Sequence, residues 1–163
     1  ISYRLVGSEM CIRDSFFGGE AGPASAGWGV GVQTNDLVMT HGWMGDVNQI
    51  PSQLHLVASH KDQVLKLPEG AEVFASSDFC PVSGFTLGDE VLTIQGHPEL
   101  SAEYSEALMG VRRQLLGEDV YQAGINSLQK STDERLFARW MLAFINDQAA
   151  VSDQVEVSRQ RHG

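Results

Sequence analysis

The period of the apolar residues changes at Pro98, and this change constrains the fold more than any other feature of the sequence. Between Gly27 and Gln95, short runs rich in Val, Leu, Thr and Phe alternate with Gly, Pro, Asn and Asp, a pattern typical of strands joined by turns. After Pro98 the apolar residues recur every three or four positions, as in amphipathic helices. The sequence therefore predicts strands first and helices last.

Several short segments have the composition of strands. Gly88-Asp89 separates the last two of them, and we expect a tight turn there because Gly supplies the positive φ that such turns need. The predicted strands cover residues 28–32, 37–40, 54–59, 73–76, 84–87 and 91–95.

Three helices are predicted after Pro98. Ser101 is the expected N-cap of the first helix, which ends at Gly117. A shorter helix follows from Glu118 to Leu128. Ser131 and Glu134 predict a capping box for the last helix, whose broad apolar stripe suits burial against a sheet. The residues that indicate the two longer helices are Tyr104, Leu108, Val111 and Leu115, and then Leu136, Phe137, Trp140, Met141, Phe144 and Ile145.

Composition limits the classes of function. The chain has 163 residues, about the length of one domain. Its formal charge of −10 repels phosphate backbones and anionic membranes, so no nucleic-acid or membrane partner is expected. No run of about 18 apolar residues and no secretory signal is recognised. Two distant cysteines, Cys11 and Cys80, favour neither a disulfide framework nor a zinc site, so we expect a cytoplasmic protein without a cofactor.

Residues 1–15 differ in character from the rest of the chain, because they carry no sustained helical or strand period. The run Tyr3 to Ser15 resembles translated sequencing-adapter read-through. We therefore exclude residues 1–15 from the fold prediction as an artefactual or disordered segment. Residues 148–163 are expected to form a polar C-terminal tail.

The segment Val91-Leu-Thr-Ile-Gln-Gly-His-Pro-Glu99 has the strongest indication of chemistry. An apolar strand delivers His97 and Glu99 to its carboxyl end, where open α/β sheets place their ligands. Gly96 permits a close approach of another backbone or of a ligand. A carboxylate beside an imidazole fixes its tautomer and stabilises the imidazolium that forms when the histidine accepts a proton. A strand-ending turn with a solvated carboxylate is the alternative interpretation.

Several segments, taken in order, resemble the class I glutamine amidotransferases, and the similarity is closest to free-standing relatives of the amidotransferase domain of GMP synthase. The resemblance covers residues 16–147, which we expect to form a partial amidotransferase domain. It rests on Phe17-Gly-Gly19, Ala26-Gly-Trp-Gly-Val30, Val57-Ala-Ser-His-Lys-Asp-Gln-Val64, Leu67-Pro-Glu-Gly-Ala71, Ala75-Ser-Ser-Asp-Phe-Cys-Pro-Val82 and Gly96-His-Pro-Glu99.

The resemblance implies a three-layer, flavodoxin-like α/β fold, of which this chain would hold the C-terminal part. It also implies a Cys-His-Glu triad that hydrolyses glutamine through a γ-glutamyl thioester. His97 would be the general base and Glu99 its orienting carboxylate. Ser59 and His60 would lie on a loop near the bound glutamine, although a strand-ending polar turn explains them equally well. No metal is implied, and a synthetase partner that uses the ammonia is compatible with the resemblance.

The sequence departs from the family at the nucleophile. Family members carry it in a Gly-x-Cys-x-Gly-x-Gln elbow, whose small residues permit a strained strand-to-helix turn. Cys11 has Glu9 and Arg13 two positions away on either side, and Cys80 is followed directly by a proline. We therefore expect that the elbow was lost upstream of Phe16 and that the chain as printed is inactive.

Two other functions stay open at this point. The first is a γ-glutamyl peptidase or hydrolase with the same triad and a different γ-glutamyl donor. The second is a non-catalytic binding domain that keeps the fold without the nucleophile.

Overall fold

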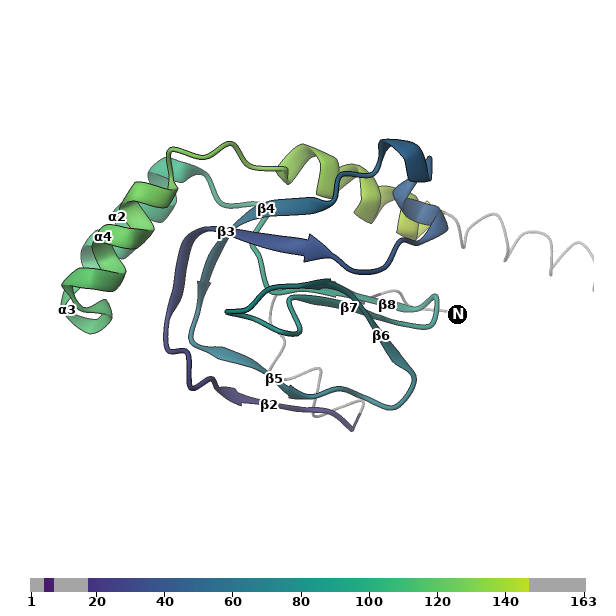
Figure 1. Ribbon diagram of the computed structural model, residues 1–163, viewed down its shortest axis with the longest axis horizontal. Coiled ribbons are helices and arrows are strands. Elements are labelled where there is room, and N and C mark those ends of the chain that lie inside the picture. The colour runs from purple at the N-terminus through teal and green to yellow at the C-terminus, as the bar shows by residue number, and fades with distance from the viewer. Residues whose placement is uncertain (1–4, 8–17, 147–163) are drawn as a thin grey trace, which may run out of the picture.

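The computed structural model describes residues 5–7 and 18–146 (Figure 1). The predictions for Cys11, for the rest of residues 1–15 and for the tail at 148–163 lie outside these residues. The strands are β1 (Leu5–Gly7), β2 (Glu20–Pro23), β3 (Gly29–Leu37), β4 (Gln53–His60), β5 (Asp62–Lys66), β6 (Ala71–Ser76), β7 (Gly84–Leu87) and β8 (Val91–Ile94). The helices are two 3-10 turns (Gly42–Met44 and Val47–Gln49), α2 (Ala102–Val111), α3 (Arg113–Leu116), α4 (Glu118–Ser127) and a further helix over residues 134–146.

Six strands form one sheet in the order β1-β8-β7-β6-β3-β4, and β2 pairs with β5 in a separate two-stranded sheet. Within the six-stranded sheet, β1 and β8 run parallel and the other neighbours run antiparallel. Figure 1 shows α2, α3 and α4 together at one end of the molecule, and the helix 134–146 along the β4 side of the sheet. The prediction of a mixed α/β fold with strands before helices is confirmed.

The strand predictions hold in part. β7 and β8 form the expected hairpin, with a turn at residues 88–90 in which Gly88 has a φ of +52°. The predicted strand at 28–32 is confirmed as the start of β3, which continues to Leu37 and pairs with β4 over eight residues. The predicted strand at 37–40 is wrong, because β3 ends at Leu37. Two strands, β2 and β5, were not predicted, since neither has an apolar alternation of its own.

One strand lies inside the segment that we excluded from the fold. Leu5–Gly7 forms β1, and it pairs with Val91, Leu92 and Thr93 of β8. The physical reason is that β8 offers unpaired backbone groups along that edge, and a short apolar segment can satisfy them. Three of the fifteen residues that we excluded from the fold prediction therefore form a strand.

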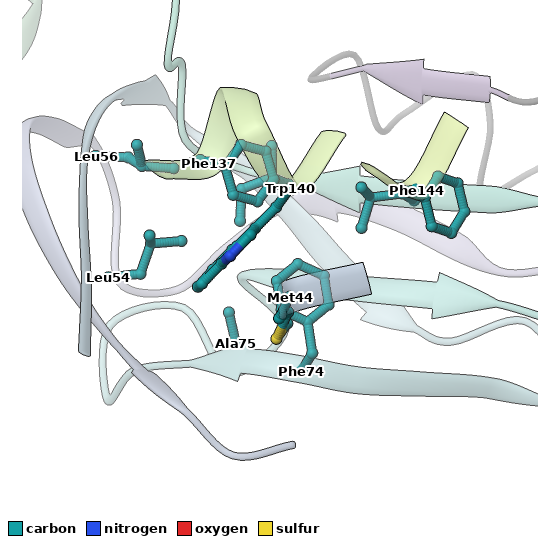
Figure 2. Packing of buried hydrophobic residues seen from close by; sticks show 10 residues of the cluster. Met44, Leu54, Leu56, Phe74, Ala75, Phe137, Trp140 and Phe144 are labelled. Atoms are coloured by element: carbon teal, nitrogen blue, oxygen red, sulfur yellow. The ribbon is translucent and has the colours of Figure 1, made fainter. Parts of the chain in front are cut away.

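The main core lies between the sheet and the helix 134–146 (Figure 2). Phe137, Trp140 and Phe144 project from one face of this helix, at the predicted spacing, onto the sheet. Most of the other buried residues in this core lie in β4, β6 and β8. The buried members of this core are Met44, Leu54, Leu56, Phe74, Ala75, Leu92, Ile94, Phe137, Trp140 and Phe144.

A second apolar cluster joins the other helices to β3. Val30, Met109 and Leu116 are its buried members, and Trp28 packs against them. The residues whose spacing predicted the first helix are not the ones that pack: Tyr104, Val111 and Leu115 are exposed. The helix breaks at Arg112, between α2 and α3, so its buried face changes along its length.

Candidate active site

His97 and Glu99 lie just after β8, whose four residues are all buried. The Nδ1 atom of His97 is 2.8 Å from Oε1 of Glu99. Glu99 can only accept when ionised, so this contact places the proton on Nδ1 and leaves Nε2 as the acceptor. The side chain of His97 is 22% exposed, which leaves the ring accessible to a substrate. The two side chains therefore have the geometry of a general base and the carboxylate that orients it.

The backbone around His97 is held against β4. The amide N–H of His97 donates to the carbonyl of Val57 at 2.7 Å. At Gly96, an added Cβ would lie 2.7 Å from the Cβ of Leu56, closer than real Cβ contacts come. The glycine before His97 is thus required for the close approach of β4, in agreement with the sequence analysis.

Ser59 and His60 are the last two residues of β4, not part of a loop. They pair with Val30 and Gly29 across the β3–β4 hairpin, which extends the strand to its last residue. Because successive strand residues point to opposite faces, the two side chains lie on different sides of β4. The location of this pair on a loop, which the resemblance implied, is wrong.

His60 lies close enough to His97 for their charges to interact. Burial lowers the pKa of His60, and the positive charge on protonated His97 lowers it further, whereas the carbonyl and carboxylate of Asp62 act in the opposite direction. Nδ1 of His60 lies 3.2 Å from the carbonyl of Asp62, which can only accept, so the proton sits on Nδ1. His60 is therefore neutral at neutral pH and its Nε2 atom is a hydrogen-bond acceptor.

A small cavity adjoins this region. Gly96 and His60 are among its lining residues, and its volume is about 10 Å³, room for a single water-sized group. Gln95 also lines it, and its side-chain oxygen has no hydrogen-bond partner in the described part of the chain. The amide nitrogen of Gln95 donates to the carbonyl of Asp62 at 3.0 Å.

Cys80 lacks the environment of a nucleophile. Its side chain is buried, and burial raises the pKa of the thiol to about 11, against the smaller opposing effect of the Val82 carbonyl. At neutral pH the thiol is protonated, whereas the thiolate is the reactive form. In the parts of the chain that the structure describes, no three His, Cys, Asp or Glu side chains gather as metal ligands would.

Arg112 is a residue near the candidate site that the sequence analysis did not identify. Its Nη1 atom donates to the hydroxyl of Ser59 at 3.2 Å. The two residues are 53 positions apart, and Arg112 belongs to a pair of arginines in a helical segment. The positive charge of Arg112 was the only signal in the sequence, and a charge alone does not indicate which part of the sheet the side chain contacts.

The chain is similar in sequence and in fold to class I glutamine amidotransferases and their relatives. No family model matches the chain. It is 40% identical over 90 residues to γ-glutamyl peptidase 3 of Arabidopsis thaliana, covering 53% of this chain and 36% of that protein. It is 31% identical over 99 residues to the glutamine-hydrolysing GMP synthase subunit of Methanocaldococcus jannaschii, covering 57% of this chain and 48% of that protein.

The solved structures agree on the fold. A glutamine amidotransferase from Thermotoga maritima superposes with a TM-score of 0.63 at 16% identity, covering 90% of this chain and 62% of that structure. The flavodoxin-like amidotransferase fold, of which this chain holds a part, is therefore confirmed. The chain spans 36% of the length of the γ-glutamyl peptidase above. None of the helices in the described residues is long and apolar enough to cross a membrane.

Proposed function

We propose that this domain belongs to an enzyme that hydrolyses the γ-glutamyl C–N bond of glutamine. The observation that carries the proposal is the 2.8 Å contact between His97 and Glu99 directly after β8. In this proposal His97 is the general base, Glu99 orients it, and Ser59 and His60 contact the bound substrate. The two groups of similar proteins, the γ-glutamyl peptidases and the glutamine-hydrolysing components of GMP synthase, are both named for γ-glutamyl or glutamine hydrolysis.

The proposed reaction runs through a thioester. A cysteine sulfur attacks the γ-carbonyl carbon of glutamine, and His97 accepts the thiol proton and passes it to the departing ammonia. Water then attacks the thioester carbon, His97 accepts one of its protons, and glutamate leaves as the thiol is restored. Glu99 stabilises the imidazolium in both halves of the reaction.

The nucleophile in this proposal comes from outside the printed sequence. Cys80 is buried with a raised pKa and lies in no Gly-x-Cys-x-Gly-x-Gln elbow, and the flanking residues of Cys11 do not fit an elbow either. We therefore propose that residues 1–15 are artefactual and replace the elbow segment of a longer protein. An in-frame elbow in the genomic sequence before Phe16 would support this proposal, and its absence would favour a non-catalytic binding domain.

A γ-glutamyl peptide is the second candidate donor. The observation that favours it is the 40% identity to γ-glutamyl peptidase 3, against 31% for the archaeal GMP synthase component. The same pair would act on either donor, because the bond that breaks is a γ-glutamyl amide in both. If glutamine is the donor, a separate synthetase chain would receive the ammonia, because the archaeal relative is named as one part of a GMP synthase. We place the enzyme in the cytoplasm.

Glutamate release tests the proposal. We expect the complete gene product to release glutamate from glutamine or from a γ-glutamyl dipeptide, and the printed chain to release none. A printed chain that turned over at about 10 per second, near the median enzyme rate, and lost that activity in Cys80→Ala would contradict the assignment of the nucleophile. A complete gene product with an intact elbow and no activity on either donor would contradict the function.

A further inference from the structure

Arg112 brings a positive charge to the end of β4. It lies at the break between α2 and α3, and its Nη1 atom donates to the hydroxyl of Ser59 at 3.2 Å. Its guanidinium carbon lies 5.9 Å from the centre of the Trp28 ring. A planar cation over an aromatic ring is held by the ring's negative face, which limits the orientations of the guanidinium.

The backbone that carries Arg112 is well anchored. Met109 and Leu116 are buried on the two sides of the break, in the cluster against which Trp28 packs. Both ends of the helical break are therefore fixed to β3, and the aromatic ring comes from the same cluster. The position of the guanidinium is set before any ligand binds, which lowers the entropy cost of binding.

Arg112 forms no ion pair in the described residues, although the chain carries 21 Asp and Glu against 11 Lys and Arg. Its neighbour Arg113 is paired with Glu118 through two hydrogen bonds of 2.8 and 2.6 Å. A guanidinium has five N–H donors, and the hydroxyl of Ser59 accepts only one hydrogen bond from it here. The other N–H groups of the guanidinium include two parallel donors, whose spacing matches the two oxygens of a carboxylate.

The position of Arg112 relates it to the candidate active site. The amide of His97 donates a hydrogen bond to the carbonyl of Val57 in β4. Ser59 lies two residues further along that strand, about 7 Å from Val57. Figure 1 shows α2 and α3 at this end of β4. Arg112 therefore contacts Ser59, one of the residues proposed to contact the substrate, on the strand that also accepts a hydrogen bond from the backbone of His97.

We propose that Arg112 binds a carboxylate of the γ-glutamyl substrate and so selects donors that carry one. The inference rests on the proposed function and specifies the substrate class. Two carboxylates have the required chemistry: the α-carboxylate of every γ-glutamyl compound, and the C-terminal carboxylate of a γ-glutamyl peptide. In both cases the hydroxyl of Ser59 shares the guanidinium with the ligand and keeps it in place.

Binding of four ligands to the full printed chain tests the inference without requiring the nucleophile. The probes are glutamine, glutaminamide, γ-glutamylglycine and γ-glutamylglycine amide, titrated while NMR follows the amide signals of β4 and the indole N–H of Trp28. We expect removal of the recognised carboxylate to weaken binding to the wild type at least about tenfold, as for a charge-assisted bidentate contact. The pair of ligands that shows this loss identifies which carboxylate is bound.

Two arginine variants make the test specific. In Arg112→Gln the affinity for the carboxylate ligand should fall by the same factor, and amidation of the ligand should then change nothing. Arg112→Lys, which keeps the charge without the fork, should bind with intermediate affinity. Arg113→Gln, an adjacent change of the same net charge, should bind like the wild type.

Three outcomes would contradict the inference. If the wild type binds the ligands and Arg112→Gln binds them within twofold, Arg112 is not the contact, although the proposed function stands. If Arg113→Gln weakens binding equally, the effect is one of overall charge. If the wild type binds none of the four ligands at millimolar concentration, the inference fails, whereas the proposed function is tested separately by glutamate release from the complete gene product. Because the amidated ligands probe the wild type directly, the test holds even if Arg112→Gln does not fold.

Discussion

At the scale of single residues, the candidate site depends on close contacts that allow little variation. Gly96 is the clearest case, because it lies between the buried strand β8 and His97 and presses against Leu56. A side chain at this position would have to displace β4 or the loop that carries His97. The stability of the domain and the geometry of the site are therefore coupled at this residue.

We expect Gly96→Ala to lower the free energy of unfolding by about 1–3 kcal/mol, the usual cost of overpacking a dense interior. Chemical denaturation with urea measures this change. Gly110→Ala is the matched control, because nothing lies within 4 Å of the added methyl group and alanine favours a helix. Equal stability of the Gly96→Ala variant and the wild type would show that the approach of Leu56 is looser than described.

The lowered pKa of His60 predicts a dependence of stability on pH. Between this lowered pKa and the ordinary value of 6.5, the folded chain binds fewer protons at His60 than the unfolded chain does. Stability therefore rises with pH through that window, and the contribution of His60 is lost as the pH falls below 6.5. We expect His60→Asn to flatten the increase in Tm between pH 5 and 7. If Tm rises with pH equally steeply in His60→Asn and in the wild type, the conclusion that His60 is buried in its neutral form would be contradicted.

At the scale of elements, the helix 134–146 supplies three buried aromatic side chains to the main core. Phe137 is fully buried in the main core (Figure 2), which also contains residues of β4, β6 and β8. Asp133, just before the helix, accepts hydrogen bonds at 2.7 Å from the amide and at 3.1 Å from the ring of His55 in β4. The start of the helix is thus tied to the strand that carries Ser59 and His60.

We expect Phe137→Ala to destabilise the domain by about 3–5 kcal/mol, since it removes a large buried side chain and leaves a cavity. Leu142→Ala is the control, because Leu142 lies on the same helix and is 60% exposed, so it should cost less than about 0.5 kcal/mol. Thermal and urea unfolding of both variants measure the difference. Similar effects in the two variants would mean that this helix does not cover the sheet as described.

The elements also show what could be predicted from sequence and what could not. The stripe that contains Phe137 and Trp140 has a strong helical period, so its position and buried face were both predictable. The predicted capping box of Ser131 and Glu134 was wrong, because the helix begins at residue 134 and the hydroxyl of Thr132 bonds to Glu134 instead. Caps depend on the exact first residue of a helix, which the apolar period does not fix.

Long-range contacts set the other limit. His97 and Glu99 are two residues apart, so their contact could be expected from the strand that precedes them. The contact between Arg112 and Ser59 depends on how α2 packs on the sheet, and no local pattern contains that information. For the same reason β5 was missed, because it is a strand only through its pairing with β2.

At the scale of the whole molecule, the net charge of −10 dominates the electrostatics. Like charges repel one another more strongly in the compact state, so screening should stabilise the fold. We expect the Tm to rise by a few degrees between about 10 mM and 150 mM NaCl, where the Debye length falls from about 30 to 8 Å. A Tm that falls with salt would mean that the ion pairs outweigh this repulsion.

The central claim is that His97 and Glu99 act as base and orienting carboxylate in γ-glutamyl hydrolysis. Steady-state kinetics of the complete gene product tests it most directly, with His97→Ala and Glu99→Gln compared with the wild type and their melting curves measured alongside. We expect kcat to fall by several powers of ten in His97→Ala and less in Glu99→Gln, with KM and Tm nearly unchanged, because one variant loses the proton acceptor and the other only its orienting charge. Equal activity in all three proteins, or losses that only follow unfolding, would contradict the claim.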